Sequence, residues 1–384
     1  MLLKLLLRNA FRHKLRNVLT VCGMCIAILA FGMLRTVISA WYAGVEASSA
    51  SRLVTRNAIS LVFSLPLSYR DKIRGTEGVK TVSYGNWFGG IYIDEKNFFA
   101  NFAVEPKTYL ELYPEYVVPL EQKETFLRDR KGCVAGAKLA RRFGWEIGDN
   151  ITLKGTIFPG NWEFVLRAIY TGREKTTDQS QFFFHWDYLN ESLRKTAPSR
   201  ADKVGFYVIG LTNPDLAAQT AEAIDKMFKN SYAETLTETE KAFQQSFVSL
   251  SEAIITAIRL VSLVIIVIIM AVVANTMVMS VRERMGEYAV FKTLGFGPLF
   301  LAGMILGESL FITCFGGGIG ILLTFPVAKA FGRAVGDWFP VFNVARETIY
   351  MDCAAAVAVG VIASVFPIWR AIHVGIAEGL RRIG

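Results

Sequence analysis

Five charged side chains lie close together in residues 280–297, a short segment between two long apolar blocks. They are Arg282, Glu283, Arg284, Glu287 and Lys292. On a short helix they give one face a dense set of charges of both signs, and the remaining positions are mostly apolar. Gly295 and Gly297 would end that helix. Such a helix suits docking into a groove on a partner protein, so we expect residues 280–297 to form a cytoplasmic docking segment.

One more charge, that of Glu308, falls well inside the apolar block that follows. A carboxylate inside a membrane costs several kcal/mol unless it is paired or protonated, so it is a candidate for function. The structural alternative is a hydrogen bond across a helix interface, for example to Asn275 or Ser309. Proton coupling would need a relay, and Glu308 is the one acid that we identify within the spans.

The residue types that most enzymes need do not gather in the sequence. The three histidines, His13, His185 and His373, fall in different regions, and there is no phosphate-binding Gly-x-x-x-x-Gly-Lys-Ser/Thr loop. Of the five cysteines only Cys133 lies outside the apolar blocks, so the polar part of the chain holds no internal disulfide. We expect no catalytic residue, no metal site and no cofactor bound by this chain.

The elements that position these residues follow from composition. Of 384 residues 52% are hydrophobic and 20% are charged, and mean hydropathy is +0.35. A soluble globular chain is nearer 25% charged. The apolar residues concentrate in four blocks, each long enough to span a bilayer. We expect transmembrane helices at residues 17–41, 251–279, 298–328 and 349–369.

The distribution of positive charge sets the expected topology. Residues 1–16 contain no acid and five basic residues: Lys4, Arg8, Arg12, Lys14 and Arg16. This is the positive-inside pattern of membrane proteins. It accounts for part of the net charge of +9, so that charge does not indicate nucleic-acid binding. Both termini are then cytoplasmic, with an amphipathic helix at 1–16 and a tail at 370–384. Residues 42–250 form a periplasmic domain, and 329–348 form a short outer loop.

The periplasmic segment alternates helix-like and strand-like patterns, so an α+β domain is expected. Residues 134–143 have the spacing of a helix, and 151–153, 164–170 and 203–211 those of strands. From about Thr237 an apolar stripe without Pro or Gly runs into the second span. We expect one continuous helix there, rising from the membrane as a stalk.

Small residues at four-residue spacing mark the third apolar block. Gly303 and Gly307 form one pair, and Gly316 and Gly320 form another. Glycines at this spacing let helices approach closely. The pattern fits packing within one chain and packing between subunits equally well.

The docking segment resembles the coupling helix of the MacB/FtsX family of ABC transporter permeases, the type VII group. Its residues that match the family pattern are Ser280, Val281, Glu283, Arg284, Glu287, Lys292, Leu294 and Gly295, whereas Tyr288 and Phe296 depart conservatively. Residues 9–20, 139–153, 367–370 and 378–381 resemble other parts of the family. The resemblance implies four transmembrane helices and a MacB-like periplasmic core between helices 1 and 2.

The resemblance also implies a mechanism. Two permeases pair with two ATPases, ATP binding moves the coupling helices, and stalks relay the motion to the periplasmic domains. This chain has no fused ATPase, so ATP and Mg²⁺ would be bound by a partner ABC ATPase dimer. A second permease copy is implied, with a homodimer favoured over a heterodimer.

Three functions remain open within that family. The first is efflux with a periplasmic adaptor and an outer-membrane channel. The second is regulation of a periplasmic cell-wall hydrolase, as in the FtsX branch. The third is a subunit of a lipoprotein-release permease. The length of the periplasmic segment favours the first and the third.

Overall fold

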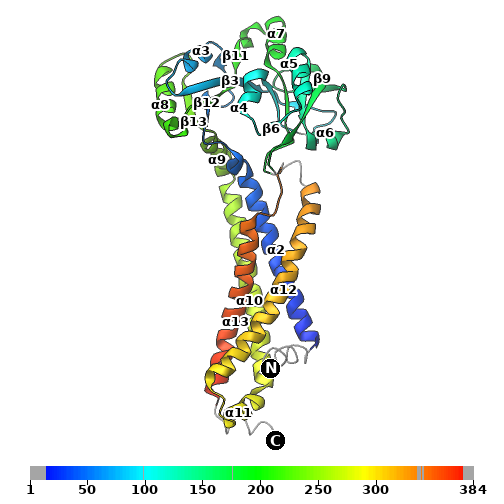
Figure 1. The fold of residues 1–384 in the computed structure, drawn as a ribbon, viewed down its shortest axis with the longest axis vertical. Coiled ribbons are helices and arrows are strands. Elements are labelled where there is room, and N and C mark those ends of the chain that lie inside the picture. The colour runs from blue at the N-terminus through cyan, green and yellow to red at the C-terminus, as the bar shows by residue number, and fades with distance from the viewer. Residues whose placement is uncertain (1–13, 98, 175, 335–338, 340, 375–384) are drawn as a thin grey trace. The chain divides into compact units, whose positions relative to one another are not determined.

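The computed structural model describes residues 14–97, 99–174, 176–334, 339 and 341–374 (Figure 1). Residues 1–13 of the expected amphipathic helix and residues 375–384 of the expected tail lie outside the described residues. The chain divides into two compact units. The first comprises residues 1–40, 251–334 and 342–384, and the second comprises 41–250 and 335–341.

The first unit is a bundle of long apolar helices, of which the first continues at residues 41–47 into the second unit. They are α2 (Lys14–Ala47), α10 (Glu252–Glu283), α12 (Pro298–Ala334) and α13 (Arg346–His373), with the short α11 (Met285–Thr293) between α10 and α12 (Figure 1). All four long helices have the length and hydropathy to cross a membrane. The membrane class of the chain is therefore confirmed, and each helix is longer than the span expected for it.

A narrow core holds these helices together. Met24 and Ile28 of α2 belong to one hydrophobic cluster with Val273 of α10, Leu301 of α12 and Val359 of α13. Most of the remaining apolar surface faces outward; on α10, Leu260, Leu263 and Ile268 are all more than half exposed. Such a surface is stable in lipid and would aggregate in water.

The second unit is built on one mixed sheet, so the expected α+β domain is confirmed. In spatial order its strands are β13 (Thr235–Thr239), β1 (Arg52–Asn57), β12 (Phe206–Leu211), β3 (Val79–Trp87), β5 (Asn101–Val104), β10 (Phe182–His185), β7 (Gly132–Gly136), β9 (Gly160–Gly172), β8 (Asn150–Gly155) and β4 (Gly90–Ile91), and β6 (Tyr116–Val117) also pairs with β9. The pairs β5–β10 and β7–β9 are parallel, and the others are antiparallel.

Helices cover this sheet, and a second small sheet flanks it. The helices are α3 (Tyr69–Arg74), α4 (Pro106–Leu112), α5 (Leu120–Arg128), α6 (Ala137–Phe143), α7 (Trp186–Thr196), α8 (Ala217–Met227) and α9 (Glu240–Leu250), with 3₁₀ turns at Pro198–Arg200 and Pro214–Leu216. The small sheet pairs β2 (Leu65–Pro66) with β11 (Lys203–Val204).

Both faces of the central strands are buried. Phe182 and Phe184 of β10 point into one hydrophobic core, and Phe183 points into another. The same alternation places Tyr207 and Val208 of β12 in different cores. Because successive side chains of a strand point to opposite faces, these runs read as continuously apolar in the sequence.

Two expectations about this unit were wrong in detail. Residues 132–136 form strand β7, and helix α6 begins only at Ala137, because β7 is buried between β9 and β10. The stalk is also not one helix from Thr237. That residue pairs with Thr55 in β13, α9 begins at Glu240, and a break at Ser251 separates α9 from α10.

Candidate functional site

The predicted docking segment is shared between two helices. Residues 280–283 are the last turn of α10, and the chain turns at Arg284, which has φ −105° and ψ 13°. Helix α11 then runs from Met285 to Thr293, and Gly295 ends the segment with φ +86°. A positive φ favours glycine at a helix C-terminus. Pro298 starts α12, so the chain breaks twice within this short stretch, at Arg284 and again at residues 294–297.

Arg284 and Glu308 form a buried ion pair in the bundle. Arg284 Nη1 lies 2.8 Å from Glu308 Oε2, and the two side chains are 6% and 5% exposed. Ser280 Oγ donates to the other carboxylate oxygen over 3.3 Å. The carboxylate of α12 is therefore neutralised by the α10–α11 junction. Asn275 and Ser309 are not the partners given by the structure, since Ser309 donates to the carbonyl of Gly360 instead.

The other four predicted docking residues fall into two groups. Glu287 accepts a hydrogen bond from Arg284 Nε at 3.2 Å, and Glu283 accepts two from Arg16 of α2 at 2.8 and 2.9 Å. Lys292 Nζ donates to the carbonyls of Ile372 and Val374, at the end of α13. Arg282, in the last turn of α10, is exposed. Most of these charges therefore fix α11 within its own unit.

Exposed apolar side chains surround the end of α11. They are Val290, Leu294, Phe296 and Leu299, with exposed fractions of 41, 68, 42 and 89%. We call these four residues the docking patch. The docking segment was predicted from its charges, and these four exposed apolar residues were not among the predicted site residues. The available signal was the pair of large apolar residues around Gly295, where a polar turn would be usual.

The four predicted packing glycines differ in their surroundings. A Cβ at Gly316 would lie 2.8 Å from the Val21 carbonyl oxygen, and one at Gly320 would lie 2.7 Å from that of Cys25. These two glycines therefore let α12 approach the backbone of α2. Gly303 has open space around the corresponding position. Gly307 lies in the same helix, one turn further along.

A second buried acid, Asp352 of α13, was missed. It is 1% exposed, and neither carboxylate oxygen has a hydrogen-bond partner among the residues that the structure describes. Gly32 of α2 packs against it, since a Cβ there would lie 2.7 Å from Asp352 Oδ2. The expectation that Glu308 is the one acid of the spans was therefore wrong. The signal was present, because Asp352 lies inside the predicted span 349–369.

The histidine and cysteine of the second unit are packed as core residues. His185 is buried, and its Nε2 lies 2.8 Å from the Phe126 carbonyl oxygen. Burial lowers the pKa of His185 and raises that of Cys133. Among the described residues no three His, Cys, Asp or Glu side chains are grouped to hold a metal.

Comparison with known proteins gives one family match and one relative similar over nearly the full length of the chain. Residues 259–376 match the FtsX-like permease C-terminal family. Over 398 residues the chain is 25% identical to MJ1507, an uncharacterized ABC transporter permease of Methanocaldococcus jannaschii, and the match covers 97% of this chain and 96% of that protein.

Two solved structures show a weaker likeness. One is the extracellular domain of the noncanonical ABC-type transporter YknZ from Gram-positive bacteria, with a TM-score of 0.35 and 12% identity, covering 49% of this chain and all of that one. The other is a domain of a protein described as a permease from Porphyromonas gingivalis, with a TM-score of 0.35 and 13% identity, covering 50% and 92%. At these TM-scores neither likeness bears on function. Residues 259–376 therefore form an FtsX-like permease domain, and the whole chain is similar to an ABC transporter permease.

Proposed function

We propose that this chain is the permease subunit of an ABC-type export system that works by mechanotransmission. A separate cytosolic ABC ATPase binds ATP and Mg²⁺ and hydrolyses the nucleotide. The permease converts that cycle into conformational change of its periplasmic domain, which drives efflux through a periplasmic adaptor and an outer-membrane channel. In this proposal the permease is a homodimer in the inner membrane, with both termini in the cytoplasm.

The observation that carries the proposal is the way α11 is built. Arg284 ties its start to Glu308 of α12, and Lys292 ties its end to the last carbonyls of α13. Glu283, one residue before the turn, is tied to Arg16 of α2. A force on α11 is therefore passed to all four long helices, because α11 follows directly on α10. A segment held in this way transmits movement to the long helices, which a flexible loop would not do.

The docking patch supplies the surface on which such a force would act. Its four apolar side chains stay exposed although the charged residues beside them are held within the chain. Burying a large apolar side chain in a partner's groove contributes about 1.5–3 kcal/mol. The patch therefore supports an ATPase contact that is apolar at its centre.

Co-purification of the ATPase tests this assignment. The tagged chain is isolated from its own membranes in mild detergent, and the amount of bound ABC ATPase and its ATP hydrolysis are measured. Leu294→Glu with Phe296→Glu should reduce recovery of the ATPase by about tenfold or more, because each change removes apolar burial. Wild-type recovery with the double variant would contradict the assignment.

A matched control uses an exposed apolar residue of the second unit. Ile59 is 82% exposed, so Ile59→Glu adds the same charge to a similar surface. Its recovery of the ATPase should equal that of the wild type.

The proteins that accompany the ATPase also separate the efflux function from its alternatives. An adaptor or outer-membrane channel supports efflux, a cell-wall hydrolase supports the regulatory function, and a second, unlike permease supports lipoprotein release.

A further inference from the structure

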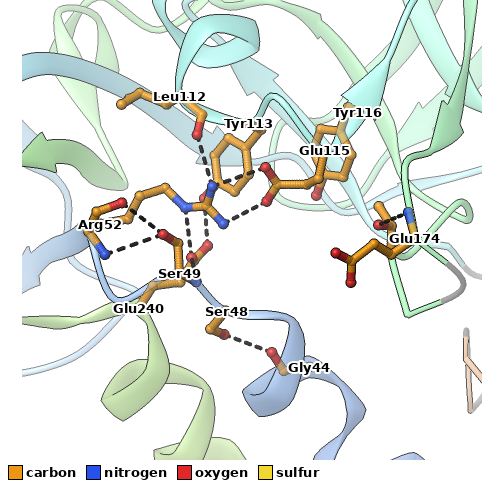
Figure 2. Close-up of polar contacts among 12 residues, drawn as sticks. Gly44, Ser48, Ser49, Arg52, Leu112, Tyr113, Glu115, Tyr116, Glu174 and Glu240 are labelled. Carbon is orange, nitrogen blue, oxygen red and sulfur yellow. Dashed lines mark hydrogen bonds and ion pairs between the residues drawn. The ribbon is translucent and has the colours of Figure 1, made fainter.

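A buried polar network lies in the second unit where the chain leaves α2 and where it approaches α10. Arg52, the first residue of β1, follows the end of α2 by five residues, and its side chain is 6% exposed. Glu240, the first residue of α9, precedes α10 by twelve residues. Figure 2 shows both side chains converging with Glu115 from the segment between α4 and β6.

Glu240 joins the two segments that lead to the long helices. Its Oε2 accepts from Arg52 Nε at 2.7 Å and from the Ser49 backbone N–H at 3.0 Å. Just before Ser49, Ser48 Oγ donates to the Gly44 carbonyl in the last turn of α2 (Figure 2). The end of α2 and the start of α9 are thus held by one carboxylate.

Glu115 and its neighbours form the third arm of the network. Arg52 Nη1 and Nη2 donate to the two oxygens of Glu115 at 3.1 and 2.6 Å, and Nη1 also donates to the Leu112 carbonyl at 2.9 Å (Figure 2). The guanidinium lies 4.3 Å from the centre of the Tyr113 ring. Tyr113 donates its hydroxyl to Glu240 Oε1 at 3.0 Å, and burial raises the pKa of that hydroxyl, which keeps its proton.

The third arm continues into the sheet through backbone contacts. Tyr116 pairs with Gly172 of β9, and the Arg173 N–H donates to the Glu115 carbonyl at 2.9 Å. Strand β9 is the longest strand described, with 13 residues, and it pairs with β7, β8 and β6. The network therefore links both helix-leading segments to β9, which is separated from β1 in strand order by β12, β3, β5, β10 and β7.

The fold alone does not require this network. Strands β1 and β13 already pair from Leu53 to Asn57, which holds the two helix-leading segments together. A buried ion network also adds little stability over apolar packing of the same volume. What the planar guanidinium fork of Arg52 adds is a fixed geometry between three segments, since it is carried by β1 and donates in set directions to the other two, at Glu240 and at Leu112–Glu115.

We propose that the Arg52–Glu115–Glu240 network is a mechanical joint, which makes the ends of α2 and α9 and the β6–β9 part of the sheet move as one body. The inference rests on the proposed mechanotransmission. Arg52, Glu115 and Glu240 act in it as positioning residues. Without the fork, α9 moves and the β8–β9 end of the sheet does not follow.

The test uses the full-length permease with its ATPase in lipid nanodiscs. Exposed residues Gln245 of α9 and Lys154 of β8 are replaced by cysteine in a chain whose native cysteines are removed, and spin labels are attached. Their distance distribution is measured by pulsed electron spin resonance with and without ATP and vanadate. Arg52→Lys keeps the charge and loses the fork. We expect the wild-type distribution to be unchanged by nucleotide, and that of Arg52→Lys to shift and broaden.

Arg56→Lys is the matched control on the same strand. Arg56 pairs with Glu238 of β13 at 3.3 Å and should behave as the wild type. If Arg52→Lys and the wild type have equal distance distributions between positions 245 and 154, and equal thermal unfolding midpoints, the proposed mechanical joint is wrong. A single label at Gln245 on both copies reports whether nucleotide moves α9 at all. No change there in the wild type would overturn the proposed function, and the joint with it.

Discussion

The two units each bury an arginine, but in different surroundings. In the bundle, Arg284 pairs with Glu308, whose side chain is 5% exposed, and with Glu287, whose side chain is 40% exposed. In the second unit, Arg52 faces two carboxylates, and the Glu115 side chain is 25% exposed. Without its arginine, Glu308 keeps one hydrogen bond among the described residues, from Ser280 Oγ at 3.3 Å. Glu240 keeps two, from the Ser49 N–H and the Tyr113 hydroxyl, both at 3.0 Å. We therefore expect the loss of Arg284 to lower the free energy of unfolding by more than the loss of Arg52 does.

The largest expected effect is the loss of one partner in the bundle. Arg284→Ala leaves the Glu308 carboxylate buried and unpaired, which costs about 3–5 kcal/mol. We expect a strongly lowered unfolding midpoint of the protein in detergent. Arg282→Ala, at an exposed position of the same turn, should stay within about 0.5 kcal/mol of the wild type. Recovery of the midpoint by Arg284→Met with Glu308→Leu would show that the pair is structural and not a proton site.

A smaller loss is expected from Arg52→Ala in the second unit. It leaves Glu240 unpaired, but solvent can stabilise the partly exposed Glu115, so we expect about 2–3 kcal/mol. Arg56→Ala, which breaks a more exposed pair on the same strand, should cost about 1 kcal/mol or less. Chemical unfolding monitored by tryptophan fluorescence measures both. A cost for Arg52→Ala equal to that of Arg284→Ala would remove the difference between the two regions.

Packing in the bundle gives the next effect. Gly316→Ala places a Cβ 2.8 Å from the Val21 carbonyl oxygen and should cost about 1–3 kcal/mol. Gly303→Ala in the same helix meets nothing within 4 Å and should be neutral or stabilising, because alanine favours helix. The same detergent melts compare the two. If both variants melt alike, α12 does not depend on its close approach to α2.

The smallest effect is a pH dependence in the second unit. Burial lowers the pKa of His185 in the folded chain, so below about pH 6.5 the unfolded state binds a proton that the folded state does not. The stabilisation from neutral His185 is thus present above that pH and is lost as pH falls, by at most about 1.4 kcal/mol per unit. His185→Gln should flatten the decline of the unfolding midpoint between pH 7 and 5. An unchanged slope would mean that His185 accepts the proton while folded.

The sequence predicted the features that stand out against an apolar background. Four long apolar runs and Glu308 are recognisable because charges are rare there, and the family resemblance, which is confirmed, followed from the adjacent charged segment. The partner of Glu308 was not predicted, because Arg284 comes to it only when α10 and α12 pack. Asp352 was overlooked because it lies near the end of its span, where a polar residue is common.

The domain network was beyond sequence reasoning for a different reason. Charged residues are frequent in soluble domains. In the sequence, Glu115 and Glu240 lie 63 and 188 residues from Arg52. Strand β7 was mistaken for helix because a short apolar run buried on both faces has no periodicity that separates the two. In both cases the outcome depends on tertiary packing between segments that are far apart in the sequence. The local sequence pattern does not show which segments will pack together.

The most direct test of the central claim is a site-specific photo-crosslink in living cells. A photoreactive amino acid is placed at Leu294, in the docking patch, and in a separate strain at Ile59, in the second unit. Captured proteins are identified by mass spectrometry. The account predicts that an ABC ATPase is captured from Leu294 and not from Ile59. Capture of lipid alone from Leu294, or of the ATPase from Ile59, would contradict it.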